Sequence, residues 1–245
     1  MKFIKTFAQL VFIMIISLVV ISSAQTRDLK ASLGYVPLLS ESPEKGVLPD
    51  LIKAIDEIYT DGKISIEVYP SQRALDNVIN GSHDFFIPLL KSDTMDLDAL
   101  PYRFSETLWT SIFVLYTNKN NTEINLNNLA NYKIETNRAI MEYFDFPTLP
   151  FASTESSLKK VDIGRIDGLI YGMTATDPVL KGLGLKNVKR IKYKTFEGPI
   201  VVAKGPKGKE VESILLPLIK ILRENGTFEK IMAPLLHEKF IEWKD

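Results

Sequence analysis

The hydrophobic positions between residues 29 and 90 switch repeatedly between two spacings. An apolar run that begins at Leu29 is followed by helical spacing, strict alternation, helical spacing again and a second apolar run. Spacings of two and of about 3.6 residues are typical of strands and helices. The pattern predicts strands at 29–33, 64–68 and 84–89, a helix at 48–60, and a second helix that Ser71 caps and that ends at 80–81. Loops after the strands of such a set are where α/β proteins bind ligands.

The second half of the chain repeats this alternation after a polar, Asn-rich stretch at 118–131. A change of composition of this kind suits a crossover between two domains. Asp177 and Pro178 are typical of the cap and first residue of a short helix. The other expected elements are strands at 111–117, 132–136, 167–171, 188–193 and 199–203, and helices at 155–163, 211–222 and 228–236. We therefore expect an α/β protein built from two α/β units.

The first residues have the layout of an export signal. Two lysines precede an uncharged apolar run at 7–21, and the small residues Ser22 and Ala24 suit cleavage before Gln25. The run is shorter than the roughly 18–20 residues that cross a bilayer, which favours a cleaved signal peptide at 1–24 over an uncleaved anchor. The chain contains no cysteine, so a lipoprotein anchor, a disulfide and a thiol nucleophile are excluded. These features predict a soluble exported protein, and a bacterial periplasm fits best.

Charge and motifs exclude several function classes. Basic and acidic residues number 30 each, so no nucleic-acid partner is implied. His83 and His237 lack the paired spacing of metal ligands. The sequence has no phosphate-binding loop, no dinucleotide-binding glycine motif after a strand and no nucleophile elbow. We therefore expect no metal, no cofactor and no catalytic residue.

Six short sequence motifs, taken together in their order and spacing, identify a family more specifically than any one of them does alone. They lie at 46–55 (GVLPDLIKAI), 74–84, 104–108 (FSETL), 129–134, 164–168 (GRIDG) and 222–230 (LRENGTFEK). Together they resemble the family-3 extracellular solute-binding proteins, which have the class-II periplasmic binding fold of amino-acid-type ABC importers. The resemblance implies an α/β, two-lobed fold in which two crossover strands join the lobes and hinge closure clamps a ligand between them. Lobe 1 would comprise 25–110 and 204–245, and lobe 2, with the crossover strands, 111–203.

The sequence departs from this family where amino-acid binders are most recognisable. The arginine that usually grips an α-carboxylate would follow the strand at 84–90, but residues 91–96 read KSDTMD. The acid that usually receives the ammonium group would follow the strand at 169–171, where Gly172 and Met173 stand. A buried charge without its partner is costly. We therefore expect a ligand other than a standard α-amino acid.

Three candidate ligand-binding residues belong to lobe 1 or to the first crossover. Tyr35 follows the first strand, where the family often places an aromatic ring against the ligand, although the ring could instead anchor the loop. Lys91 follows the third strand, where polar groups commonly contact ligand, although lysines are more often solvated. Trp109 lies at the first crossover, where a large ring either lines a cleft or stiffens a hinge.

Lobe 2 contributes two further candidates. Arg138 follows the strand at 132–136, where its guanidinium and free backbone N–H groups would hold a carboxylate or a phosphate. The alternative is a surface ion pair with Glu142 or Glu135. Tyr171 ends the next strand, and alternation does not decide whether it faces the cleft or the core, because this strand is expected to be buried on both faces.

Three functions remain open. The leading hypothesis is a monomeric periplasmic protein that captures a small polar or anionic solute and delivers it to an inner-membrane ABC permease. The second is a sensory or accessory binding protein that signals to a membrane partner. The third is an enzyme similar to the cyclohexadienyl dehydratases of the same fold, which would need an acid or base such as Glu106 or Asp177 in the cleft.

Overall fold

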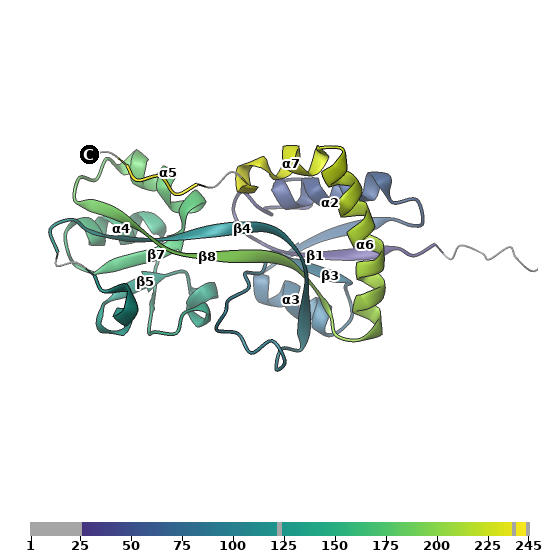
Figure 1. The fold of residues 1–245 in the computed structure, drawn as a ribbon, viewed down its shortest axis with the longest axis horizontal. Coiled ribbons are helices and arrows are strands. Elements are labelled where there is room, and N and C mark those ends of the chain that lie inside the picture. The colour runs from purple at the N-terminus through teal and green to yellow at the C-terminus, as the bar shows by residue number, and fades with distance from the viewer. Residues whose placement is uncertain (1–25, 122–123, 237–238, 244–245) are drawn as a thin grey trace, which may run out of the picture.

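The computed structural model describes residues 26–121, 124–236 and 239–243. The predicted signal peptide and His237 lie outside these residues. Two α/β lobes share one continuous sheet and lie end to end, with lobe 1 on the right and lobe 2 on the left of Figure 1. Within the described part of the chain, no helix is both long enough and apolar enough to cross a membrane.

The sheet has eight strands in the order β2-β1-β3-β8-β4-β7-β5-β6. Lobe 1 contains β1 (Leu29–Gly34), β2 (Ile64–Tyr69) and β3 (Phe85–Ile87), and lobe 2 contains β5 (Ile134–Thr136), β6 (Leu149–Pro150) and β7 (Gly168–Gly172). The long strands β4 (Tyr102–Asn118) and β8 (Val188–Ala203) pair antiparallel through both lobes. Trp109 and Ile200 pack in a core of lobe 1, whereas Ile112 and Phe196 pack in cores of lobe 2. β4 and β8 are therefore the two crossover strands.

Strand direction brings the carboxyl ends of both lobes together. β3 is antiparallel to β8, and β1 and β2 are parallel to β3, so these three strands run in the same direction as β4, toward lobe 2. In lobe 2, β7 is antiparallel to β4, and β5 and β6 are parallel to β7, so these strands run toward lobe 1. Open α/β sheets bind ligands at the carboxyl ends of their strands. The boundary between the lobes is thus the expected binding region.

Helices cover both faces of each half of the sheet. Lobe 1 carries α2 (Val47–Ile58), α6 (Pro206–Glu224) and α7 (Thr227–Leu236) on one face and α3 (Ser71–Ile79) on the other; lobe 2 carries α4 (Thr154–Asp162), α5 (Met173–Leu183) and the 3-10 helices η1 (Leu126–Asn131) and η2 (Arg138–Tyr143). β3 shows how alternation builds these layers. Phe85 and Ile87 pack with the α2 face, while Phe86 between them packs with Ala74 of α3.

The last described residues, 239–243, lie on lobe 2 although α7 belongs to lobe 1 (Figure 1). The Arg190 side chain donates a hydrogen bond to the carbonyl oxygen of Ile241 at 2.8 Å. Its guanidinium carbon lies 4.8 Å from the ring centre of Phe240 and 4.3 Å from that of Trp243. A guanidinium over the face of an aromatic ring is attracted to it electrostatically. Residues 239–243 therefore pack on lobe 2 through Arg190.

Several expected elements differ from those observed. The stretch at 118–131 is not a crossover, because the N–H of Lys119 donates to Asn187 at the end of lobe 2 that lies farthest from lobe 1. α5 begins at Met173, whose side chain is buried in a core of lobe 2, so Asp177 and Pro178 lie inside the helix. Ser71 is the first residue of α3 and makes no capping hydrogen bond. Tertiary packing extends helices and strands beyond the bounds that local signals suggest.

Candidate functional site

The carboxyl ends of β5 and β7 place Asn137 and Tyr171 side by side in lobe 2. The Thr136 hydroxyl donates to the carbonyl oxygen of Ile170 at 2.7 Å and ties the two strand ends together. The side-chain oxygen of Asn137 accepts the N–H of Ala139 at 2.9 Å and so caps η2. Its amide nitrogen donates to the Tyr171 hydroxyl at 3.5 Å. The side-chain amide of Asn137 is therefore held in place with an N–H group directed at Tyr171.

Tyr171 lies between the core and the lobe boundary. It is half-buried, and its ring makes edge-to-face contacts with Phe151 at 5.3 Å and with Phe113 at 6.2 Å between centroids. Burial raises the pKa of its hydroxyl, so the group stays protonated at neutral pH. Within the described residues no acceptor takes its proton. A half-buried donor is therefore available to a ligand.

Arg138, the first residue of η2, is exposed, and its side chain forms no hydrogen bond or ion pair with any residue of the described ranges. The alternative of an ion pair with a neighbouring glutamate is not observed. Glu135 is instead bonded to Lys160 at 2.8 Å and to the hydroxyl of Ser157 at 2.5 Å. Arg138 directly follows Asn137 in the sequence and therefore provides an exposed guanidinium without a described counter-ion.

In lobe 1, Tyr35 lies at the carboxyl end of β1 beside the end of β2. Its N–H donates to the carbonyl oxygen of Tyr69 at 2.7 Å, and its side chain is 53% exposed. Both tyrosines line a mostly apolar hollow of about 450 Å³, which is completed by Glu41, Ser42, Pro43, Val68 and Pro70. Arg73 stacks on Tyr69, with its guanidinium carbon 4.9 Å from the ring centre. The exposed ring of Tyr35 is thus placed to contact a molecule at the lobe boundary.

Lys91 is engaged with the crossover strand β8. Its ammonium nitrogen lies 3.1 Å from a carboxylate oxygen of Glu197, and its backbone N–H donates to the carbonyl oxygen of the same residue at 2.8 Å. Both side chains are partly exposed, so the pair is screened by solvent. The charge of Lys91 is nevertheless compensated, unlike that of Arg138.

The segment that follows β3 docks on lobe 2 through apolar side chains. Lobe 2 presents an aromatic cluster, which consists of Phe113, Phe144, Phe146, Tyr193 and Phe196. Leu89, Leu90 and Met95 pack against the buried core of lobe 2 to which Phe113, Phe144 and Phe196 of this cluster belong. The Ser92 hydroxyl donates to the carbonyl oxygen of Tyr143 at 3.3 Å. The segment that follows β3 therefore contacts lobe 2 through apolar side chains and one hydrogen bond.

Trp109 is a core residue of lobe 1, only 4% exposed. Its ring lies against the backbone of Gly198 on β8, where a Cβ atom would come within 2.3 Å of it. The position matches the hinge-stiffening alternative, in which the ring fills space between the crossover strands.

The acids named for an enzymatic function are engaged in ion pairs. Asp177 accepts two hydrogen bonds from Arg190, at 2.9 and 2.5 Å, and one from the Tyr116 hydroxyl at 2.7 Å. Glu106 lies 3.4 Å from the guanidinium of Arg223. At the position of the usual ammonium-binding acid, Met173 is buried, and the first turn of α5 contains no acid.

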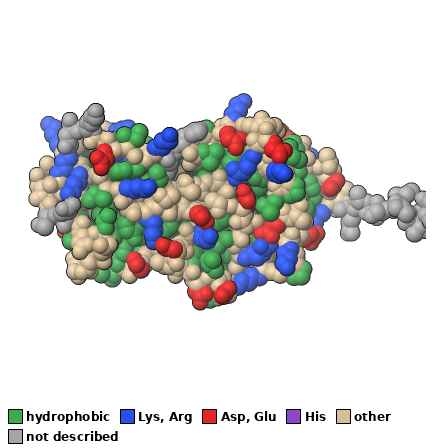
Figure 2. All heavy atoms as spheres, in the orientation of Figure 1, with side chains coloured by type: hydrophobic (Ala, Val, Ile, Leu, Met, Phe, Trp, Pro, Cys, Tyr) green, Lys and Arg blue, Asp and Glu red, His purple; other side chains and the backbone are tan. Residues whose placement is uncertain are grey.

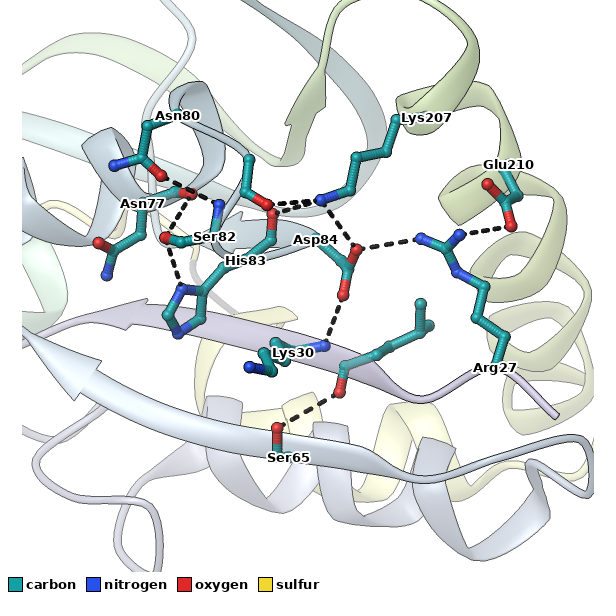
Figure 3. Close-up of polar contacts among 12 residues, drawn as sticks. Arg27, Lys30, Ser65, Asn77, Asn80, Ser82, His83, Asp84, Lys207 and Glu210 are labelled. Carbon is teal, nitrogen blue, oxygen red and sulfur yellow. Dashed lines mark hydrogen bonds and ion pairs between the residues drawn. The ribbon is translucent and has the colours of Figure 1, made fainter.

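The described histidine, His83, belongs to a polar network in lobe 1 (Figure 3). Asp84 accepts the N–H of Lys30 at 2.8 Å and a guanidinium N–H of Arg27 at 3.0 Å. These residues lie at the amino ends of β1 and β3, away from the lobe boundary. Among the described residues, no group of three or more His, Cys, Asp or Glu side chains is arranged to hold a metal. The network ties the amino ends of the lobe 1 strands together.

The sequence did not single out Asn137, Phe151 or the aromatic cluster. Asn137 directly precedes Arg138 at a strand end, and this position was a usable signal. The cluster gathers side chains from β4, β8 and the residues after η2, so no local pattern reveals it. Figure 2 shows charges of both signs on both lobes, as the balanced composition implies.

Comparisons with known proteins support the fold. No protein-family model and no curated protein matches the sequence. A histidine kinase sensor domain with similarity to periplasmic binding proteins superposes with a TM-score of 0.66 at 16% identity, over 87% of this chain and 97% of that one. The GluR0 ligand-binding core from Nostoc punctiforme, in complex with L-glutamate, gives 0.63 at 14% identity over 86% and 100%.

The substrate-binding protein of an amino acid ABC transporter gives a TM-score of 0.61 at 15% identity, over 86% of this chain and 100% of that one. These solved structures are binding proteins or sensor domains rather than enzymes. At such identities the likeness concerns the fold, because one fold hosts many functions. The chain therefore has the two-lobed fold of the family-3 periplasmic solute-binding proteins.

Proposed function

We propose that this protein is a periplasmic receptor that captures a small anionic solute, other than a standard α-amino acid, between its lobes and delivers it to an ABC-type importer. The observation that carries the proposal is the exposed guanidinium of Arg138, which has no described counter-ion. It directly follows Asn137, whose side-chain amide donates to the Tyr171 hydroxyl at the converging strand ends. An α-amino acid would also need an acid for its ammonium group. That position holds buried Met173.

Binding is coupled to hinge closure in this proposal. The lobes move about β4 and β8, and a ligand that contacts both lobes favours the closed arrangement by its differential affinity. Tyr35 supplies a contact from lobe 1, and Arg138 and Tyr171 supply contacts from lobe 2. Only the closed surface docks productively on the permease. Binding energy comes from hydrogen bonds and aromatic contact, without a covalent step.

The test is a thermal-shift screen of the chain that begins at Gln25, against amino acids, dicarboxylates, phosphorylated acids, aromatic acids, polyamines and sugars. A ligand at a hundred times its dissociation constant stabilises the native state by ~2.7 kcal/mol, which raises Tm by about 5–10 °C. We expect an anion that is not an amino acid as the strongest ligand. A standard amino acid as the strongest ligand would overturn the proposal.

Arg138→Ala should weaken binding of that ligand about 10- to 100-fold, the usual effect of removing a charge-assisted hydrogen bond. Arg165→Ala is the matched control. Arg165 is also exposed and its side chain has no described partner, but it precedes β7 at the opposite end of that strand. Equal losses in both variants would show a general effect of charge instead of a contact at the strand ends.

A sensory role is the second candidate, because a solved sensor domain of a histidine kinase has the same fold. Transport and sensing differ in what a deletion removes. Cells that lack the protein should lose uptake of the identified solute if it serves an importer. Unchanged uptake with a lost transcriptional response to the solute would favour the sensory role.

A further inference from the structure

The polar groups at the lobe 2 strand ends stand against an aromatic wall. Phe151 follows β6, and its N–H donates to the carbonyl oxygen of Thr136 at 2.9 Å, which fixes it beside the end of β5. Its ring meets Tyr171 edge-to-face at 5.3 Å, and both side chains are half-buried. Half-exposed rings at a lobe boundary offer apolar area to a ligand, and aromatic partners gain additional energy from ring geometry. The strand ends therefore combine a surface for a flat ring with hydrogen-bond donors.

The donors fit one anionic group. The Tyr171 hydroxyl has a proton without a described acceptor, the Asn137 amide has a second N–H group, and the guanidinium of Arg138 has no described counter-ion. Three donor groups that have no described acceptor favour a carboxylate as their partner, because a carboxylate accepts several hydrogen bonds through its two oxygens. The backbone of α5 begins directly after β7 with no acid in its first turn. A ligand cation would thus find no counter-charge among these groups.

Lobe 1 adds a third ring, and the segment after β3 adds no further cation without a described partner. Tyr35 is 53% exposed at the carboxyl end of β1, so its ring is available at the boundary that the lobe 2 strands also face. Lys91 is paired with Glu197, and the neighbouring leucines pack against the buried core of lobe 2. The chemistry from lobe 1 is therefore aromatic contact.

From these observations we propose that the ligand is an aromatic carboxylate without an α-ammonium group. Its carboxylate is held by Arg138 and the Tyr171 hydroxyl, and its ring lies against Phe151 and Tyr171 of lobe 2 and Tyr35 of lobe 1. This inference rests on the proposed receptor function and deepens it by naming the ligand class.

Isothermal titration calorimetry with four probes tests the ligand class on the chain from Gln25 onward. Phenylacetate and 4-hydroxybenzoate carry the ring and the carboxylate, L-phenylalanine adds the ammonium group, and benzylamine replaces the anion by a cation. At least one aromatic carboxylate should bind 10-fold or more tightly than the other two probes. Tighter binding of L-phenylalanine or benzylamine would overturn the inference.

Three variants test the residues. Arg138→Ala should weaken the best aromatic carboxylate at least 10-fold, and Tyr171→Phe, which keeps the ring and removes the hydroxyl, should weaken it about 3- to 10-fold. Arg165→Ala should leave the affinity unchanged. Circular dichroism and Tm would establish that each variant folds, and an unchanged affinity of a folded Arg138→Ala variant would overturn the inference.

The two proposals fail in different ways. If both aromatic carboxylates fail to bind while another anion of the thermal-shift panel binds in an Arg138-dependent way, the receptor function stands and the ligand class is wrong. If no compound of any class stabilises the folded protein, both proposals are contradicted.

Discussion

Gly198→Ala tests how the crossover strands are packed at the hinge. In the observed structure the added Cβ would lie 2.3, 2.5 and 2.6 Å from three ring atoms of Trp109. Such distances are about 1 Å or more shorter than the usual contact of about 3.5–4 Å. The ring is 4% exposed and packed in the lobe 1 core, so it has no free direction in which to move. Overpacking of this kind costs about 1–3 kcal/mol.

For a chain of this size, ~2 kcal/mol lowers Tm by about 4–8 °C. Urea unfolding followed by tryptophan fluorescence would measure both the loss of stability and the displacement of the indole ring. Gly182→Ala is the matched control, because a Cβ atom added at Gly182 would meet nothing within 4 Å and the residue lies inside α5. That variant should gain ~0.5–1 kcal/mol, since alanine favours helix more than glycine.

A double variant separates the clash from a backbone effect. Trp109→Phe removes part of the ring that meets residue 198, so Gly198→Ala should cost less in that background, and the two changes should be non-additive. A Gly198→Ala variant with the same Tm as the unchanged protein would refute the close packing of Trp109 against Gly198. Purely additive effects would show that the loss comes from the strand backbone.

Three other perturbations have defined outcomes. Burial lowers the pKa of His83 in the folded protein, whereas an unfolded histidine has a pKa of about 6.5. The unfolded chain therefore binds more protons at acidic pH, and the free energy of unfolding should fall as the pH drops from 7.5 to 5. Urea titrations at these pH values should show a weaker pH dependence for His83→Gln, and an unchanged dependence would exclude His83 as its source. Arg190→Met should cost ~3 kcal/mol, because it leaves Asp177 largely buried without a cation, and Asp177→Asn in the same chain should recover part of the loss in thermal melts. Met95→Ser removes an apolar contact between the segment after β3 and the buried core of lobe 2 and should shift the unliganded protein toward more open lobes. An unchanged radius of gyration in X-ray scattering would show that this contact does not hold the lobes together.

Local sequence signals predicted the architecture well where periodicity and turns agree. The helical spacing before Gly62 matches α2, and the alternation from Ile64 matches β2. They failed where tertiary packing overrides a local signal. Asp177 and Pro178 read as a helix start, yet Met173 begins the helix because its side chain is buried in the core of lobe 2.

The sequence predicted that the candidate residues lie at strand ends. The strand ends at Tyr35, Arg138 and Tyr171 face the lobe boundary, as the strand directions show, and contact of these residues with a ligand stays a prediction. Which charges are compensated did not follow from the sequence. Lys91 meets Glu197, 106 residues away, whereas Arg138 meets no described acid.

The sequence by itself predicted the helices and strands whose spacing and turn residues are clear, because these are local properties of the chain. Its motifs resemble a family whose two-lobed α/β fold the structure shares. Only the tertiary structure decided which arginine is left without a described counter-ion, that Trp109 fills a core, and that the segment after β3 docks on the buried core of lobe 2. Ion pairs and core contacts join residues far apart in the sequence, and their partners are chosen by packing in three dimensions.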